Sequence, residues 1–224
     1  MAAPLPILLS TAYLPPVQYV SKFMLNTPVF IERYENYQKQ SYRNRCYIYG
    51  ANGIQCLVIP VKKTHGEKTP VTEVEIDYSY PWTKIHVKTL ESAYRLSPFF
   101  EYYAEEILAV YEQKIPQLFE LNTTLLHSIL GLLDIKSSLR FTASFEPAVS
   151  RDYDDFRYSV HPKNRLNRPD NSFTPFPYQQ VFNERFGFLS NLSIIDLLFN
   201  EGPNARDIIR QSLKNKDLLQ ESNV

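Results

Sequence analysis

Short apolar runs separated by turn residues dominate the first third of the chain. Runs bounded in this way are typical of buried strands. The runs that predict strands are residues 7–13, 29–31, 45–49, 55–60 and 74–76. Asn52-Gly53 lies between the third and fourth runs and predicts a hairpin turn. Pro15-Pro16 ends the first run, and Pro16 is expected to begin a helix that reaches about Leu25.

The middle of the chain has the spacing of amphipathic helices. Apolar residues at every third or fourth position predict a helix over residues 83–95. Ser97-Pro98 interrupts this pattern, and a second stripe of apolar residues predicts another helix from about Pro98. A third helix is expected over residues 116–133, where leucine and isoleucine recur in register.

The last third of the chain begins with a short predicted strand at residues 139–143 and then changes character. Residues 144–180 are rich in proline, charge and aromatic side chains, which predicts irregular structure docked on the body of the protein. A buried helix is expected at 192–199 and an amphipathic helix after Gly202-Pro203. This order of elements favours an α/β or α+β fold, with one domain over residues 1–224 and a mixed sheet covered by helices.

Charge and composition limit the classes of partner. Lys plus Arg and Asp plus Glu number 24 each, so extended nucleic-acid binding is not expected. The sequence contains no apolar stretch of membrane-spanning length and no recognisable signal peptide, and we expect a cytoplasmic protein. Cys46 and Cys56 lie on neighbouring predicted strands and are expected to be reduced, buried thiols.

Residues 36–45 form a polar loop between two predicted strands and contain no aliphatic residue. Amide, guanidinium and phenol groups are directional hydrogen-bonding groups that suit an anionic, hydroxyl-rich ligand. We predict that Lys39, Asn44 and Arg45 converge with Tyr13 and Gln38 on one concave site. The alternative is an exposed basic turn whose charges face only water.

Familiar catalytic signatures are missing from the sequence. It contains no GxGxxG, GxxxxGK[ST], HExxH, GxSxG or CxxC motif, and the four histidines have no metal-ligand spacing, so no cofactor or metal is expected. His86 lies at the start of a predicted helix and is a candidate general base or phosphate-binding group. Alternatively, it packs on Trp82 or Leu90 as a structural side chain.

Asp196 lies in a strongly apolar segment, where an unpaired carboxylate costs several kcal/mol. One interpretation pairs it with Lys39, Arg45 or His86 in a functional site. The other treats Ser193-x-x-Asp196 as a helix-capping box.

Four further residues are candidates for ligand binding, and they lie beside the helix predicted over residues 83–95 or in the irregular segment, where binding groups often occur. They are Trp82, His161, Tyr178 and Gln179.

Five segments resemble a known family. They are residues 11–19 (TAYLPPVQY), 37–45 (YQKQSYRNR), 58–62 (VIPVK), 82–86 (WTKIH) and 188–203 (FLSNLSIIDLLFNEGP). Together they resemble the motifs of the WbqC-like family over nearly the whole chain. Longer members carry a His-Gln-Pro-like sequence where Ser10-Thr11-Ala12 stands here, and a central Ser-rich stretch that is reduced between residues 135 and 156.

The resemblance implies a function in bacterial surface-polysaccharide assembly, including O-antigen. The first hypothesis is a transferase that acts on an activated amino-sugar, with a nucleotide-sugar as substrate and with His86, Lys39 and Asp196 as catalytic residues. The second is a non-catalytic protein that binds a sugar or a partner through the same site.

Overall fold

The chain forms two sheets and several helices around shared buried side chains. The computed structural model describes residues 4–63, 68–147, 152–163 and 169–214. Its buried apolar residues make one continuous cluster that extends from Ile7 to Leu213. One sheet is parallel and the other is antiparallel, so the predicted α/β or α+β class is confirmed with the strands divided between two sheets.

The parallel sheet contains β1 (Ile7–Ser10), β2 (Val29–Glu32), β5 (Arg140–Phe141) and β6 (Asp154–Asp155), in the order β5-β2-β1-β6. β1 pairs with β2 from Ile7↔Val29 to Ser10↔Glu32. The Ile-Leu-Leu run of β1 is almost completely buried, because a central parallel strand is covered on both faces. The helix α1 (Val17–Ser21) and a 3-10 turn (Lys22–Met24) form the crossover from β1 to β2.

β3 (Arg45–Gly50) and β4 (Gly53–Val58) form the predicted hairpin. Gly53 has a φ of +97°, a conformation that a residue with a side chain adopts only under strain, so the turn requires glycine here. Cys46 is buried, whereas Cys56 opposes Tyr47 on the other face and is exposed. The prediction that both thiols are buried is therefore wrong for Cys56, because an offset of one position reverses the face of a strand.

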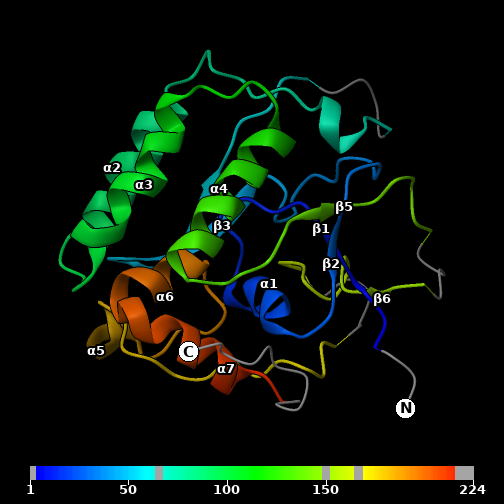
Figure 1. The fold of residues 1–224 in the computed structure, drawn as a ribbon. Helices are drawn as coiled ribbons and strands as arrows, with labels where there is room; N and C mark the ends of the chain where they lie inside the picture. The colour runs from blue at the N-terminus through cyan, green and yellow to red at the C-terminus, as the bar shows by residue number, and fades with distance from the viewer. Residues whose placement is uncertain (1–3, 64–67, 148–151, 164–168, 215–224) are drawn as a thin grey trace.

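Three consecutive helices, α2 (Trp82–Tyr94), α3 (Phe100–Glu112) and α4 (Leu118–Leu132), contact each other in sequence (Figure 1). After the short α5 (Asn183–Phe186), α6 (Ile194–Glu201) and α7 (Ala205–Ser212) follow, with a 3-10 turn (Gly202–Asn204) between them, and both contact α1. The amphipathic helices thus lie close to their predicted positions.

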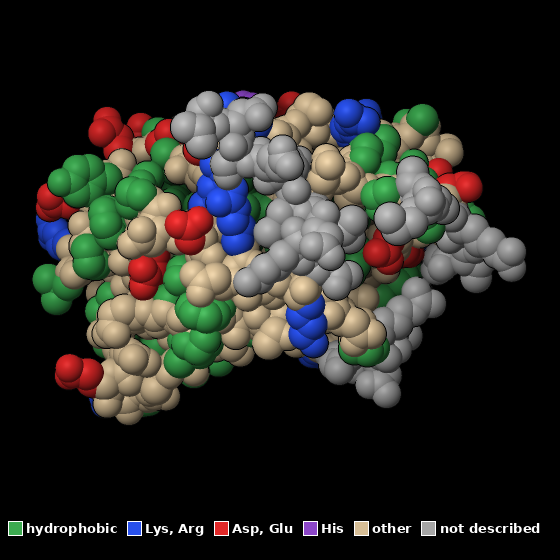
Figure 2. Space-filling model, turned by 60° about the horizontal axis from the view of Figure 1, so that its bottom comes forward, with side chains coloured by type: hydrophobic (Ala, Val, Ile, Leu, Met, Phe, Trp, Pro, Cys, Tyr) green, Lys and Arg blue, Asp and Glu red, His purple; other side chains and the backbone are tan. Residues whose placement is uncertain are grey.

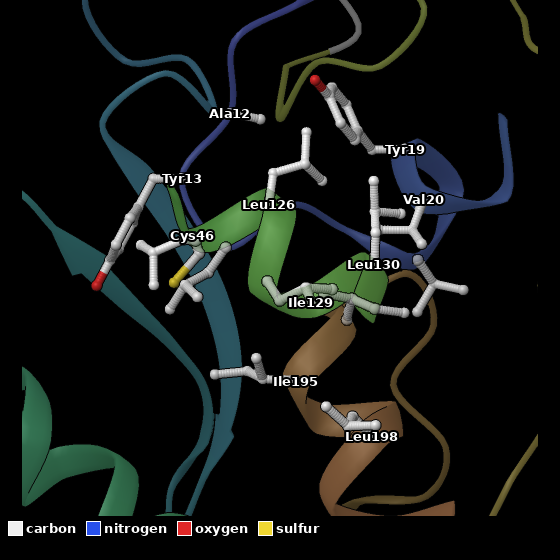
Figure 3. Close-up of a cluster of buried hydrophobic side chains, with 14 of the residues drawn as sticks. Ala12, Tyr13, Tyr19, Val20, Cys46, Leu126, Ile129, Leu130, Ile195 and Leu198 are labelled. Carbon is white, nitrogen blue, oxygen red and sulfur yellow. The ribbon is translucent and has the colours of Figure 1, made fainter. Parts of the chain in front are cut away.

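The centre of the core lies around α4 (Figure 3). Side chains from three neighbouring elements surround the inner face of this helix in the close-up: Cys46 from β3, Val20 from α1, and Ile195 and Leu198 from α6. Tyr13 and Tyr19 lie on opposite sides of this group (Figure 3), although they are close in sequence. The chain that leaves β1 therefore sends its aromatic side chains to two different parts of the protein.

The strand expected at residues 74–76 is wrong. A 3-10 turn (Val71–Glu73) stands before it, and the following residues make only isolated bridges, Glu75 with Gln117 and Ile76 with Val61. In the irregular segment, the described residues include β6, and Tyr178 is buried as expected of a docked segment. None of the helices in the described residues combines the length and the hydropathy needed to cross a bilayer.

Candidate functional site

Polar side chains collect where the parallel strands end. β1 ends at Ser10, β2 at Glu32 and β6 at Asp155. From β1, the next two strands of this sheet along the chain, β2 and β5, are added on one side. The fourth strand, β6, is added on the other side of β1, so the direction in which strands are added reverses between β1 and β6. Parallel sheets bind ligands beyond the carboxyl ends of their strands at such a reversal. The topology therefore places the candidate site at the ends of β1 and β6.

A small hollow lies at this position. Its walls come from the end of β1, from α1, from the polar loop and from the segment after β6: residues 9–12, Tyr19, 41–43, Phe156, Val160 and His161. Its volume is about 10 Å³, which is room for one water-sized group. Outside the hollow, Lys163 Nζ donates a hydrogen bond to Gln40 Oε1, so the polar loop and the segment after β6 are joined to each other.

A buried ion pair supports the wall formed by the polar loop. Arg43 Nε donates to Glu35 Oε1 at 2.9 Å, and Arg43 Nη2 donates to Glu35 Oε2. Arg43 Nη2 also donates to Ser10 Oγ at 2.8 Å, while Ser10 Oγ donates to Glu35 Oε2 at 3.0 Å. These bonds satisfy both charges away from water and fix the Ser10 hydroxyl at the hollow.

A second charged network ties the ends of the other strands together. Thr142 Oγ1 donates to Glu32 Oε1 at 2.8 Å, and Arg157 Nη1 lies 3.4 Å from Glu32 Oε2. Arg157 also donates to both carboxylate oxygens of Asp155, at 2.9 and 2.7 Å. Burial opposes the charge on Arg157, but the hydrogen bond and charge of Asp155, together with the charges of Glu35 and Glu32, raise the pKa of the guanidinium. The two networks hold the carboxyl edge of the sheet in one shape.

Sequence reasoning missed Ser10, Glu35, Arg43 and Arg157 as individual site residues. Each is an ordinary polar residue by type, and none belongs to a catalytic motif. The sequence indicates a role for Ser10 only through its position, because Ser10 comes directly after Ile7-Leu8-Leu9, an apolar run typical of a central strand.

His86, the candidate base, lies inside the protein with 4% of its surface exposed. Its Nδ1 is 2.8 Å from Tyr13 Oη, which in turn is 2.5 Å from Tyr111 Oη. The His86 ring also meets the edge of Trp82, with 5.1 Å between ring centroids. Burial lowers the pKa of His86 to about 4, so the ring is neutral at pH 7. The geometry matches the structural interpretation, and a catalytic role for His86 stays a prediction.

Asp196 is completely buried on α6 and accepts hydrogen bonds from three neutral donors. Tyr94 Oη donates to its Oδ1 at 2.8 Å, while Tyr178 Oη and Gln180 Nε2 donate to its Oδ2 at 2.6 and 2.9 Å. Burial raises the pKa of the carboxyl group, and the three donors act in the opposite direction. Neutral donors therefore satisfy this carboxylate.

The contacts of Asp196 differ from both sequence interpretations, although Ser193 is the N-cap residue of α6 and Asp196 lies in the first turn, as the capping interpretation expects. The expected pairing with Lys39, Arg45 or His86 is replaced by the tyrosine and glutamine donors. The expected capping box is not formed either, because Ser193 Oγ donates to Leu14 O at 2.8 Å and the helix has no side-chain cap.

The hydrogen bonds of the described residues do not bring Lys39, Asn44 and Arg45 together, and their convergence on one site stays a prediction. Lys39 is exposed on the polar loop, whereas Asn44 is buried and donates from Nδ2 to Ile59 O at 2.9 Å. Arg45 is half-buried in β3. The hollow beside the loop is lined by residues 41–43 and by none of these three.

The remaining candidates are dispersed. Tyr13 points to His86, and Gln38 is half-buried with its carbonyl bonded to Ser41 Oγ. Gln179 is exposed and its main-chain N–H donates to Glu201. His161 is the candidate that lines the hollow, and its Nδ1 lies 2.8 Å from Lys163 O.

Two of the sequence segments that carry the family resemblance meet in space. Gln18 N–H donates to Asn191 Oδ1 at 3.0 Å, and Val17 N–H donates to Leu192 O at 3.1 Å. Ile194 N–H donates to Pro15 O at 2.8 Å, so main-chain bonds run in both directions. The segment before α6 thus supports the chain that leaves β1 and borders the site.

On the face drawn in Figure 2, cationic and anionic side chains stand in separate small groups, and the coloured residues form no continuous basic surface. Among the described residues, no group of three or more His, Cys, Asp and Glu side chains is arranged to hold a metal ion.

Comparison with known proteins identifies similarity to one family. The model of the WbqC-like protein family matches residues 11–160, a span that includes the polar loop and the hairpin and ends at Val160, before His161 and Lys163. A protein of Mycobacterium tuberculosis named "Uncharacterized protein Rv1507c" is 27% identical over 197 residues, covering 78% of this chain and 84% of that protein. No solved structure matches the chain significantly.

Proposed function

Because the chain belongs to the WbqC-like protein family, we propose that it transfers an acyl group to an activated amino-sugar in the assembly of bacterial surface polysaccharide. The observation that carries the proposal is the hollow at the carboxyl ends of β1 and β6, the position where parallel sheets bind ligands. Its lining includes the polar residues Ser10, Thr11, Ser41 and His161, whose side-chain types suit a hydroxyl- or amine-bearing ligand.

The size of the hollow defines how a sugar binds. A volume of about 10 Å³ admits one hydroxyl or amine group and not a whole ring. The ring therefore rests at the mouth, against the joined pair Gln40 and Lys163. Lys39 is exposed on the same loop, so both cations are available to the phosphate groups of a nucleotide-sugar.

The reaction that this arrangement supports is attack of the sugar amine on the carbonyl carbon of an acyl thioester. The amide C–N bond forms as the C–S bond breaks, and the bonding electrons of C–S leave with the thiolate. His161 accepts the proton released by the amine and returns it to the thiolate. We infer that this takes place in the cytoplasm with a nucleotide-sugar as the acceptor.

The direct test is a mass measurement. The purified protein is incubated with nucleotide-linked amino-sugars and an acyl thioester, and the expected product is heavier by the acyl group less one hydrogen. His161→Gln should lower the rate by about 100-fold, the scale of general-base catalysis. The matched control is His127→Gln on the exposed side of α4, which should leave the rate unchanged. Equal rates in both variants would remove His161 from the mechanism.

A second candidate function is binding without catalysis. The observation that favours it is the burial of His86 and Asp196, 4% and 0% exposed, with their polar atoms bonded inside the protein. Calorimetric binding of a nucleotide-linked amino-sugar, with no mass change after prolonged incubation with acyl thioesters, would establish this function instead.

A further inference from the structure

A second depression lies apart from the hollow, between the β3-β4 hairpin and α2. Its volume is about 630 Å³, within the range of ligand and peptide pockets, and it shares no lining residue with the hollow. One wall is residues 50–56, which include most of β4, and the other is the α2 side chains Ile85, Lys88, Thr89, Ser92 and Ala93. We refer to it as the β4 groove.

The hairpin ladder shows which main-chain groups face the β4 groove. Ile59 N–H donates to Asn44 O at 2.8 Å, so Asn44 and Ile59 are a hydrogen-bonded pair at the open end of the hairpin. In an antiparallel ladder such pairs alternate with pairs whose N–H and C=O groups point outward. Counting from this pair in the observed register, the outward residues of β4 are Val58, Cys56 and Ile54.

The outer edge of β3 confirms the alternation and is covered. Tyr49 opposes Ile54, and its N–H donates away from β4 to Tyr94 Oη at 3.0 Å. Tyr47 opposes Cys56, and its carbonyl accepts from Ser193 N–H at 2.8 Å. Other parts of the protein therefore bond to one outward main-chain group of each of these two β3 residues.

The outer edge of β4 is covered only at one end. Burial lowers the pKa of His86 and the main chain of Val58 opposes this shift, which places the His86 ring close to that end of the edge. In the described part of the chain, the main-chain groups of Ile54 and Cys56 have no hydrogen-bond partner outside the hairpin. These two residues border the β4 groove, so their N–H and C=O groups face it.

This edge also lacks the usual protection against strand pairing. Natural edge strands carry charges, proline or a covering element, whereas β4 has no charged residue and exposes 60% of Ile54 and 41% of Val58. Across the groove, Ile85 is 40% exposed. An extended chain in the groove gains main-chain hydrogen bonds on one side and apolar contact on both.

We propose that the β4 groove binds an extended peptide segment of a partner protein, which adds to the edge of β4 as a further antiparallel strand and places a carboxylate against Lys88. Ile54 and Cys56 each offer one N–H and one C=O to the added strand. Lys88 is the charged side chain that lines the groove, and it has no ion pair within the described residues. This favours an apolar segment that carries an acidic residue.

The same charge argues against a second copy of β4 as the occupant. Pairing two copies through this edge would bring residues 50–61 of one chain into the groove of the other. That segment contains no Asp or Glu to meet Lys88. A partner segment of different sequence therefore fits better than self-association.

The experiment uses the full chain and designed hexapeptides of alternating Val and Thr. One peptide carries a single central Glu, a second carries Lys at that place, and a third is the Glu peptide with N-methylated main-chain amides. Amide exchange followed by NMR should show protection of Ile54 and Cys56 by at least about tenfold when the Glu peptide is saturating. The Lys peptide should bind roughly twofold to fivefold more weakly, as expected for one exposed ion pair.

Variants on α2 test the charge assignment. Lys88→Glu should reverse the preference between the Glu and Lys peptides, while Lys84→Glu, which lies on the same helix outside the groove, should not. The proposal is overturned if the Glu peptide fails to bind at about 1 mM, or if the N-methylated peptide binds equally well. It is also overturned if Ile54 and Cys56 become protected without peptide as protein concentration rises, because a second copy would then be the occupant.

Discussion

Arg43 and Glu35 form a buried, two-pronged ion pair that anchors the polar loop. Arg43 Nε lies 2.9 Å from Glu35 Oε1, Nη2 bonds to Oε2, and the side chains are only 3% and 7% exposed. The guanidinium is therefore neutralised by a carboxylate of the same protein. Its contribution is to fix the loop and the Ser10 hydroxyl.

Arg43→Ala should destabilise the protein strongly, because it leaves the Glu35 carboxylate buried without its partner. Breaking one side of a buried pair costs about 3–5 kcal/mol of unfolding free energy, measured by urea denaturation. The control is Lys39→Ala on the same loop, where exposure limits the change to about 0.5 kcal/mol. Equal stability of the two variants would contradict the assigned anchor.

Asp196→Asn should also lower the unfolding free energy, by about 1–3 kcal/mol. Both carboxylate oxygens of Asp196 accept hydrogen bonds. In the variant, the amide NH2 replaces one of these oxygens, so a donor then faces the donor group of Tyr94, or those of Tyr178 and Gln180. Asp207→Asn on α7 is the control, because its side chain is 65% exposed. If Asp196→Asn is as stable as the wild type, the three-donor arrangement does not hold.

His86 should make stability fall as the solution becomes acidic. Its folded pKa is about 4 against 6.5 when unperturbed, so between these values the unfolded chain binds the extra proton. Stability contributed by neutral His86 is thus fully present above pH 6.5 and is lost toward pH 4, by up to about 1.4 kcal/mol per pH unit. Comparing urea titrations of wild type and His86→Gln isolates this dependence. Identical pH profiles would contradict the burial of a neutral ring.

The two thiols should differ in reactivity in the native protein. Cys56 is exposed, whereas Cys46 is 1% exposed and burial raises its pKa, which removes the reactive thiolate. A thiol reagent under native conditions should modify one cysteine quickly and the second only after denaturation. Cys56→Ser should abolish the fast phase, and a fast phase that persists would show that Cys46 is accessible.

The main elements of the fold could be predicted because their patterns are local. The apolar run of β1, the hairpin around Gly53 and the stripes of α2 to α4 require only short-range periodicity. β6 was not predictable in the same way. It has two acidic residues, and its strand character comes from pairing with Ile7 and Leu8 far away in sequence.

For the candidate site, the sequence singled out the polar loop but not the orientation of its side chains. The polar loop does border the hollow, yet the direction of each side chain depends on contacts that one sequence does not reveal. Tyr13 follows β1 and turns toward His86, 73 positions away, while Arg43 turns inward to Glu35 and Lys39 stays in solvent. Residue type alone does not distinguish an anchoring arginine from a ligand-binding lysine.

The most direct test of the central claim is a crystal structure of the protein with a bound nucleotide-linked amino-sugar. We expect one sugar hydroxyl or amine in the hollow beside Ser10 and Ser41, with the ring at the mouth near His161 and the phosphates toward Lys39 and Lys163. A ligand bound with full occupancy anywhere else, with the hollow unchanged, would contradict the assignment of the site to the carboxyl ends of β1 and β6.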